Sequence, residues 1–190
     1  MNQEKSAYVF FATGFEEIEA ITPVDILRRA GVDVKTFSIS DSLEVKGAHD
    51  IFVKCDYTLS QLDENVLPDA VIMPGGMPGA TNLANCKKLK AFTQKCFAED
   101  KLTCAICASP AIVFGEYGLL TNKNWTCYPN MEDQAPNENL ANWKANPVVV
   151  DGNLITSRGP GTASEFSYTI LNQLGLGEKA TALKQGMLFN

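Results

Sequence analysis

Histidine is nearly absent from this sequence, which contains only His49, expected at the surface. Structural zinc sites use four cysteine or histidine ligands, commonly as two pairs of closely spaced residues. The chain has six cysteines, at positions 55, 86, 96, 104, 107 and 127, and only Cys104 and Cys107 form a C-x-x-C pair. We therefore expect no metal site. A Cys-His-Asp peptidase triad also has little support, because it has a single candidate base.

The chain also lacks a surplus of basic residues. It has 16 Lys and Arg against 22 Asp and Glu, a net charge of −6, whereas nucleic-acid binding needs a clustered positive face. Its longest largely apolar stretch, residues 102–115, is too short to cross a bilayer. The opening residues, MNQEK, have no apolar signal-peptide core. We therefore expect a cytoplasmic protein with reduced cysteines that binds neither nucleic acid nor membrane.

Short apolar segments alternate with helical patterns along the 190 residues. Strands are predicted at residues 7–12, 32–39, 70–73 and 102–106, and two more, 148–150 and 154–156, flank a hairpin turn at 151–153. Helices are predicted at 86–99, 108–117, 162–174 and 178–185. The alternation predicts one α/β domain, residues 1–190, with a mostly parallel sheet between helices.

One more helix is predicted to begin at Thr22. Thr22 is a suitable N-cap residue, Pro23 fits the first helical position, and Asp25 adds an acidic group to the first turn. The pattern continues to Ala30 and ends at Gly31, because glycine is a common residue just after a helix.

Cys107 lies at the predicted end of a parallel strand, where such folds carry their chemistry. The segment 105–109 (AICAS) joins a strand to a helix with small residues around the cysteine, which is the spacing of a nucleophile elbow. A helix N-terminus at this point would lower the thiol pKa. A buried structural cysteine is the alternative. A redox pair with Cys104 is disfavoured, because three residues of strand separate the two thiols by about 10 Å.

Two other strand ends supply partners for this thiol. Glu19 follows the first strand and, unlike the two glutamates before it, is placed to point inward. A buried glutamate beside a thiolate would share one proton with it. Residues 74–76 (PGG) end another strand, and their backbone N–H groups, with that of Ala108, form a candidate oxyanion hole. An ordinary turn is the alternative for these glycines.

Five ordered segments together resemble the DJ-one/ThiJ/PfpI superfamily, and within it the parkinsonism-associated deglycase branch, which is glyoxalase III-like. The segments are 16–19 (EEIE), 23–31 (PVDILRRAG), 73–76 (MPGG), 105–110 (AICASP) and 156–162 (TSRGPGT). The resemblance extends from the first strand to the last helix. It implies a flavodoxin-like three-layer α/β sandwich, a homodimer, and an oxidisable cysteine at the elbow.

The resemblance also implies roles for the residues that match its motifs. Cys107 takes the place of the family's cysteine, and Glu19 that of the glutamic acid that hydrogen-bonds it. Gly75, Gly76 and Ala108 match the backbone donors around the sulfur.

Three further residues concern structural support or depart from the family pattern. Arg158 matches an arginine in the family's R-G-P-G-T segment, and it is expected to support the structure by pairing with Asp25. Close relatives often carry histidine where this chain has Tyr128, whose hydroxyl is then the group that would orient a substrate carbonyl or a water. Relatives tend to have arginine where His49 stands.

The resemblance implies several chemistries between which the fold does not choose. The first hypothesis is a cofactor-independent enzyme that acts on methylglyoxal, or on its early amine and thiol adducts, through the Cys107 thiolate and Glu19. The second is an oxidative-stress sensor or chaperone in which Cys107 is oxidised to the sulfinate. A cysteine peptidase is the third and weakest hypothesis. The expected partners are a small dicarbonyl or glycated substrate and a second copy of the chain.

Overall fold

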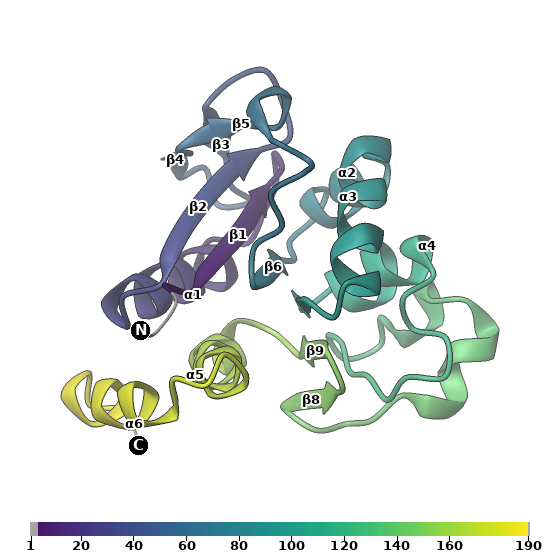
Figure 1. Ribbon diagram of the computed structural model, residues 1–190. Helices are drawn as coiled ribbons and strands as arrows, with labels where there is room; N and C mark the ends of the chain where they lie inside the picture. Colours follow the sequence, from purple (N-terminus) through teal and green to yellow (C-terminus); the bar gives the residue numbers. More distant parts are fainter. Residues whose placement is uncertain (1–3, 190) are drawn as a thin grey trace.

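The computed structural model describes residues 4–189, and their central feature is a seven-stranded sheet (Figure 1). The strand order is β5-β2-β1-β6-β7-β9-β8, and all pairs are parallel except β8 with β9. The strands are β1 (Ser6–Phe11), β2 (Asp33–Ser38), β5 (Tyr57–Thr58), β6 (Ala70–Met73), β7 (Leu102–Ile106), β8 (Val148–Asp151) and β9 (Leu154–Ser157). Every residue of β6 is buried, as expected for a parallel strand covered on both faces.

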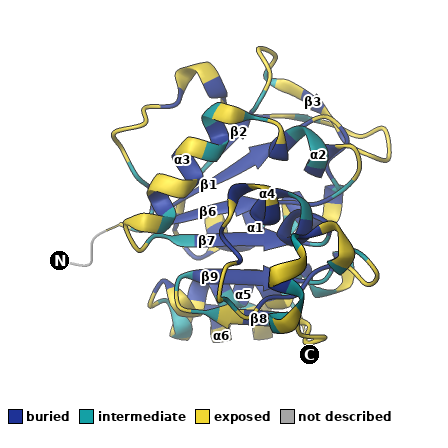
Figure 2. Ribbon diagram, turned by 90° about the vertical axis from the view of Figure 1, so that its right-hand side faces the viewer, coloured by how far each residue is buried: buried dark blue, intermediate teal, exposed yellow. Residues whose placement is uncertain are grey.

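Helices cover both faces of the sheet, so the predicted three layers are confirmed (Figure 2). One layer contains α1 (Glu17–Arg29), α5 (Ala163–Gln173) and α6 (Gly177–Gly186), and the other α2 (Gly79–Ala84), α3 (Lys87–Ala98) and α4 (Gly115–Tyr117). Val9 and Phe11 of β1 pack in the first layer, whereas Tyr8 and Phe10 pack in the second, because side chains alternate along a strand. Among residues 4–189, no helix has the length and apolar character needed to cross a membrane.

The start of α1 corrects the sequence prediction. The helix begins at Glu17 rather than at Thr22, and Pro23 lies inside it. Glu16 is the N-cap residue, and its side chain accepts a hydrogen bond from Glu19 N at 2.7 Å. Pro23 is the seventh of the thirteen residues of α1, where proline removes one backbone hydrogen bond and costs about 3 kcal/mol. The cap at Glu16 and the burial of the apolar face of α1 against the sheet outweigh this cost and the local start signal at Thr22.

Two further local predictions are refined by the structure. The predicted helix 108–117 is instead a turn followed by a π-helical segment, Pro110–Phe114, and the short helix α4. The hairpin at 151–153 is confirmed as β8 and β9. A second hairpin, β3 (Glu44–Lys46) with β4 (Phe52–Lys54), was not predicted. It forms a separate two-stranded sheet.

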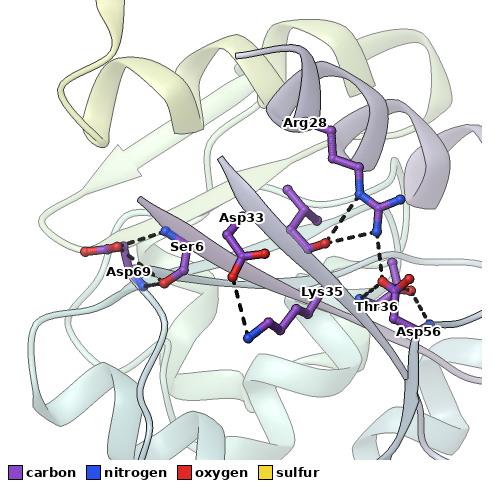
Figure 3. Close-up of polar contacts among 8 residues, drawn as sticks. Ser6, Arg28, Asp33, Lys35, Thr36, Asp56 and Asp69 are labelled. Atoms are coloured by element: carbon purple, nitrogen blue, oxygen red, sulfur yellow. Dashed lines mark hydrogen bonds and ion pairs between the residues drawn. The ribbon is translucent and has the colours of Figure 1, made fainter. Parts of the chain in front are cut away.

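Polar side chains fasten the edge of the sheet to α1 (Figure 3). Arg28 of α1 donates to Val34 O of β2 at 2.9 Å and to Asp56 at 2.8 Å. The same Asp56 oxygen accepts from the backbone and the hydroxyl of Thr36. The network connects the end of α1, the middle of β2 and the residue before β5, and so secures the side of the domain from which the β3–β4 hairpin projects.

Candidate active site

Cys107 lies directly after β7, and its backbone φ is +66°. A positive φ strains a non-glycine residue by roughly 1–3 kcal/mol and is a feature of functional sites. Backbone hydrogen bonds hold it there. Cys107 N donates to Ser157 O at 3.0 Å, and Cys107 O accepts from Tyr128 N at 2.8 Å. This strained turn from a strand to a helical segment is the geometry of a nucleophile elbow.

Glu19 is fully buried on the first turn of α1, and its carboxylate charge raises the pKa of the nearby Cys107 thiol. Its Oε2 accepts a hydrogen bond from Gly75 N at 3.0 Å. Burial raises the pKa of Glu19 to about 7, and the contacts with Cys107 and Gly75 offset this only in part. The side chain therefore points inward, as the sequence suggested, and it titrates near neutral pH.

The backbone donors expected at the sulfur act on two different groups. The N–H groups of Gly76 and Ala108 lie near the Cys107 sulfur and act to lower the pKa of its thiol. The N–H of Gly75 donates to Glu19 instead, so the prediction that this N–H group donates to the sulfur is wrong. Gly76 has a φ of +87°, a conformation that glycine adopts without strain.

The predicted lowering of the Cys107 pKa is also wrong. Burial raises the pKa of this thiol, the Glu19 carboxylate raises it further, and the N–H groups of Gly76 and Ala108 lower it by less. Two negative charges in one buried site repel each other, so the pair loses one proton near neutral pH and retains the second. The thiolate forms when the retained proton resides on Glu19.

Gly75→Ala is expected to disrupt this site, whereas Gly161→Ala is the matched control. A Cβ on Gly75 would lie 2.6 Å from Cys107 Cβ and 2.7 Å from Glu19 Oε2, while a Cβ on Gly161 would have nothing within 4 Å. We expect Gly75→Ala to slow alkylation of Cys107 and to lower the free energy of unfolding by about 1–3 kcal/mol. Iodoacetamide labelling and urea titration measure both effects. Equal results for the two variants would contradict this packing.

The predicted pairing of Arg158 with Asp25 is wrong. Asp25 pairs with Arg29 one helical turn later, at 2.8 Å. Arg158 donates through Nη1 to Ala145 O at 3.1 Å. An ion pair between two residues four positions apart on one helix forms more readily than an ion pair between distant elements. The helix already holds the two side chains close together.

A cavity of about 600 Å³ opens beside Cys107. It is lined by residues from α1, the β3–β4 loop and the loops after β7 and β9, namely Glu16, Glu17, Ile18, Glu19, His49, Ile51, Cys107, Tyr128 and Pro160. Tyr128 is 48% exposed and its ring packs against Gly159, where a Cβ would lie 3.2 Å from Cδ2. The structure thus brings Cys107, Glu19 and Tyr128 to one cavity.

His49 also lines this cavity, and sequence reasoning did not place it there. The residue is exposed, as expected, but its Nδ1 lies 2.7 Å from Glu17 Oε2. The two residues are 32 positions apart, and the hairpin that carries His49 was not predicted, so no local signal connected them. Polar atoms of Glu16, Glu17 and His49 lie within 4.8 Å of one another. Both oxygens of Glu17 already hydrogen-bond to His49, and we assign no metal site to this group.

The remaining cysteines lack the features of Cys107. All six cysteines lie within the described residues and are free thiols. Burial raises the pKa values of Cys55, Cys96 and Cys127 to about 12, and it also raises that of Cys104. Cys107 shares this raised pKa, but of the six cysteines it is the one that lines the cavity described above. Cys104 and Cys107 are both free thiols.

Fold and site together define a class of protein, a flavodoxin-like α/β sandwich with a cysteine on a strained strand–helix turn and a buried glutamate beside it. The model of the DJ-1/PfpI family matches residues 5–173. The chain belongs to the DJ-1/PfpI family.

Individual relatives agree with this assignment. The chain is 41% identical over 177 residues to Protein DJ-1 homolog B of Arabidopsis thaliana, covering 93% of this chain and 40% of that protein. It is 32% identical to the glutathione-independent glyoxalase DJR-1.2 of Caenorhabditis elegans, covering 96% of each. The structure of oxidized Toxoplasma gondii DJ-1 matches with a TM-score of 0.92 at 35% identity, covering 97% of this chain and 98% of that one. The chain spans 40% and 46% of the lengths of the Arabidopsis homologs B and A.

Proposed function

We propose that the protein is a glutathione-independent glyoxalase and deglycase that acts on methylglyoxal or on its early amine and thiol adducts. The observation that carries this proposal is the placement of Cys107 and Glu19 against the same glycine, Gly75, at the wall of one cavity. A thiol and a carboxyl group that share one proton can add to an aldehyde and then move a proton between adjacent carbons. The name of the Caenorhabditis elegans relative supports the same chemistry.

The reaction begins when the Cys107 thiolate attacks the aldehyde carbon and Glu19 donates its proton to the aldehyde oxygen, which gives a hemithioacetal. The N–H groups of Gly76 and Ala108, which lie near the Cys107 sulfur, are the proposed donors to the developing oxyanion. The Glu19 carboxylate then removes the hydrogen from this carbon and returns it to the neighbouring carbon. The aldehyde carbon is oxidised to a thioester and the ketone carbon is reduced to an alcohol. Water hydrolyses the thioester, releases lactate and restores the thiolate.

Tyr128 is the proposed contact for the rest of the substrate. Its ring lines the cavity and is half exposed, so its hydroxyl can hydrogen-bond a substrate carbonyl or a water. A cavity of about 600 Å³ is larger than methylglyoxal needs, which supports the inclusion of amine and thiol adducts among the substrates.

Lactate formation from methylglyoxal without glutathione tests this proposal. We expect the purified protein to produce one lactate for each methylglyoxal consumed, at a rate proportional to protein concentration. Methylglyoxal loss without lactate would indicate simple adduct formation with surface Lys and Arg side chains. That result, or no loss above the buffer rate, would contradict an enzymatic function.

The second candidate is a redox sensor or stress chaperone, which the same sulfur environment favours. A Cys107 sulfinate would accept hydrogen bonds from the N–H groups of Gly76 and Ala108 and from the protonated carboxyl group of Glu19. Two molecules of hydrogen peroxide supply the two oxygens and leave as two waters. Intact-mass spectrometry after mild peroxide treatment tests this function, and it fails if two oxygens do not add selectively to Cys107.

The proposed homodimer is supported by an exposed apolar face. Ile18 and Ile21 of α1 are 54% and 38% exposed, and Ile51 and Phe52 near the start of β4 are 55% and 64% exposed. The hydrogen bonds between Glu17 and His49 hold these two segments together. Ile18 and Ile51 line the same cavity, and exposed apolar side chains that gather in this way mark association sites. Sedimentation is expected to show a dimer and Phe52→Asp a monomer. A monomeric wild-type protein at micromolar concentration would contradict the assignment.

A further inference from the structure

The cavity beside Cys107 has an acid–base group that the mechanism above does not use. Glu17 is only 8% exposed, and both of its carboxylate oxygens contact the same residue, His49. Oε1 accepts a hydrogen bond from His49 N at 2.7 Å, and Oε2 lies 2.7 Å from His49 Nδ1. The contact between Glu17 and Nδ1 fixes the orientation of the imidazole ring. Nε2 remains available for proton transfer, on a side chain that is 68% exposed. A carboxylate that orients an imidazole in this way is a recurrent arrangement in acid–base sites.

The loop that carries His49 is shaped to place it there. Gly14 N donates to Lys46 O and Ala48 N donates to Phe15 O, both at 2.8 Å, so the loop is bonded to the segment that leads into α1. Gly47 packs directly on Glu17, since a Cβ at this position would lie 2.6 Å from Glu17 Cδ. A larger residue at position 47 would displace the Glu17 carboxylate from this place.

We propose that His49, oriented by Glu17, is a catalytic acid–base residue that exchanges a proton with the oxygens of the substrate bound to Cys107. This inference rests on the proposed function. When Glu19 removes hydrogen from the aldehyde carbon, the His49 imidazolium donates its Nε2 proton to the ketone oxygen, which gives a neutral enediol. When Glu19 returns the hydrogen to the second carbon, neutral His49 accepts the hydroxyl proton of the first carbon. The thioester forms, and both residues regain their starting protonation states.

The charges around His49 favour the imidazolium form that this step requires. The hydrogen bond and charge of Glu17 raise the His49 pKa above its ordinary value of 6.5, and Glu16 and Asp50 add to this rise. Lys46 on β3 pairs with Asp50 and so screens the contribution of Asp50.

Across the cavity, the other ionisable groups are the Cys107–Glu19 pair and Tyr128. The Cys107–Glu19 pair holds one negative charge above pH about 7. The rate is therefore expected to rise as this pair loses its first proton and to fall at higher pH as His49 becomes neutral.

Because His49 is the only histidine, NMR of protein labelled with ¹⁵N-histidine reports on it without ambiguity. We expect a pKa above 6.5 in the wild type and a lower value in Glu17→Gln, with Asp50→Asn changing it less. Asp50 has a φ of +65°, which asparagine also tolerates, so this control removes a nearby charge, and its ion pair with Lys46, while keeping the backbone conformation. A His49 pKa that is the same in Glu17→Gln and wild type would overturn the pairing.

Kinetics of His49→Asn test the catalytic role. We expect kcat for lactate formation to fall about 100-fold and the alkaline limb of the pH profile to disappear. Iodoacetamide is expected to alkylate Cys107 at the wild-type rate in this variant, and the control Glu116→Gln, at an exposed residue outside the cavity, is expected to keep wild-type activity. Wild-type kcat and pH profile in His49→Asn, together with an active wild type, would overturn the inference alone. Absence of lactate from the wild type itself would instead overturn the proposed function.

Discussion

Replacing Cys107 with serine is expected to abolish lactate formation, with kcat/KM falling at least about 10³-fold. The alkoxide of serine is a far stronger base than the thiolate of cysteine, and the buried site also disfavours the negative charge of an alkoxide. Glu19, with a pKa of about 7, is too weak a base to ionise a hydroxyl. Serine has nearly the shape of cysteine, so the strained backbone at position 107 is retained. Lactate assays on the purified variant measure the loss.

Cys86→Ser is the matched control for this prediction. Cys86 is half-buried and is the N-cap residue of α3, where its side chain makes no capping hydrogen bond. Serine is a preferred N-cap residue, so this variant is expected to keep wild-type activity and to gain roughly 0.5–1 kcal/mol in the free energy of unfolding. Lactate formation by Cys107→Ser at the wild-type rate would exclude thiol catalysis and leave general acid–base chemistry by Glu19 alone.

Glu19→Gln is expected to lower kcat by about 10²–10⁴-fold. Glutamine can still accept the hydrogen bond from Gly75 N, which is 3.0 Å from Glu19 Oε2, but it cannot carry a proton between the two substrate carbons. The control is Glu116→Gln, the same change at an exposed residue paired with Lys90, which is expected to leave the rate unchanged. An equal loss in both variants would contradict the role of Glu19.

The pH dependence of the wild-type rate provides a second readout of Glu19. The active form has one proton on the Cys107–Glu19 pair, and it appears as pH rises through about 7. In Glu19→Gln this acid limb is set by the thiol alone, whose pKa burial raises, so the limb moves to higher pH. An acid limb that stays near pH 7 in Glu19→Gln would show that another group controls the rate.

The same variant is expected to change stability in a pH-dependent way. The Glu19 pKa rises from its ordinary value of 4.5 to about 7 on folding, so the folded state loses stability as pH increases through this range. The shift corresponds to about 3 kcal/mol at pH 8. Glu19→Gln removes the penalty, and urea titration is expected to show a larger stabilisation at pH 8 than at pH 5. Equal effects at both values would indicate that the carboxyl group is not desolvated.

Local patterns in the sequence were sufficient for much of the fold and part of the site. Alternating strands and helices predicted the layered sheet because apolar periodicity reflects which faces are buried. The residues around Cys107 predicted the elbow because a tight turn depends on its immediate neighbours. The N-terminus of α1 was misplaced because its capping interaction begins at Glu16, before the stronger local signal at Thr22.

The sequence by itself therefore determined the order of the elements, the position of Cys107 and the inward direction of Glu19. Only the tertiary structure decided the pKa of Cys107, the division of the backbone donors and the pairing of Glu17 with His49. These features depend on burial and on contacts between distant segments, such as the 56 positions that separate Glu19 from Gly75. Desolvation and charge act through space, so residues that meet only after folding set the chemistry of the site.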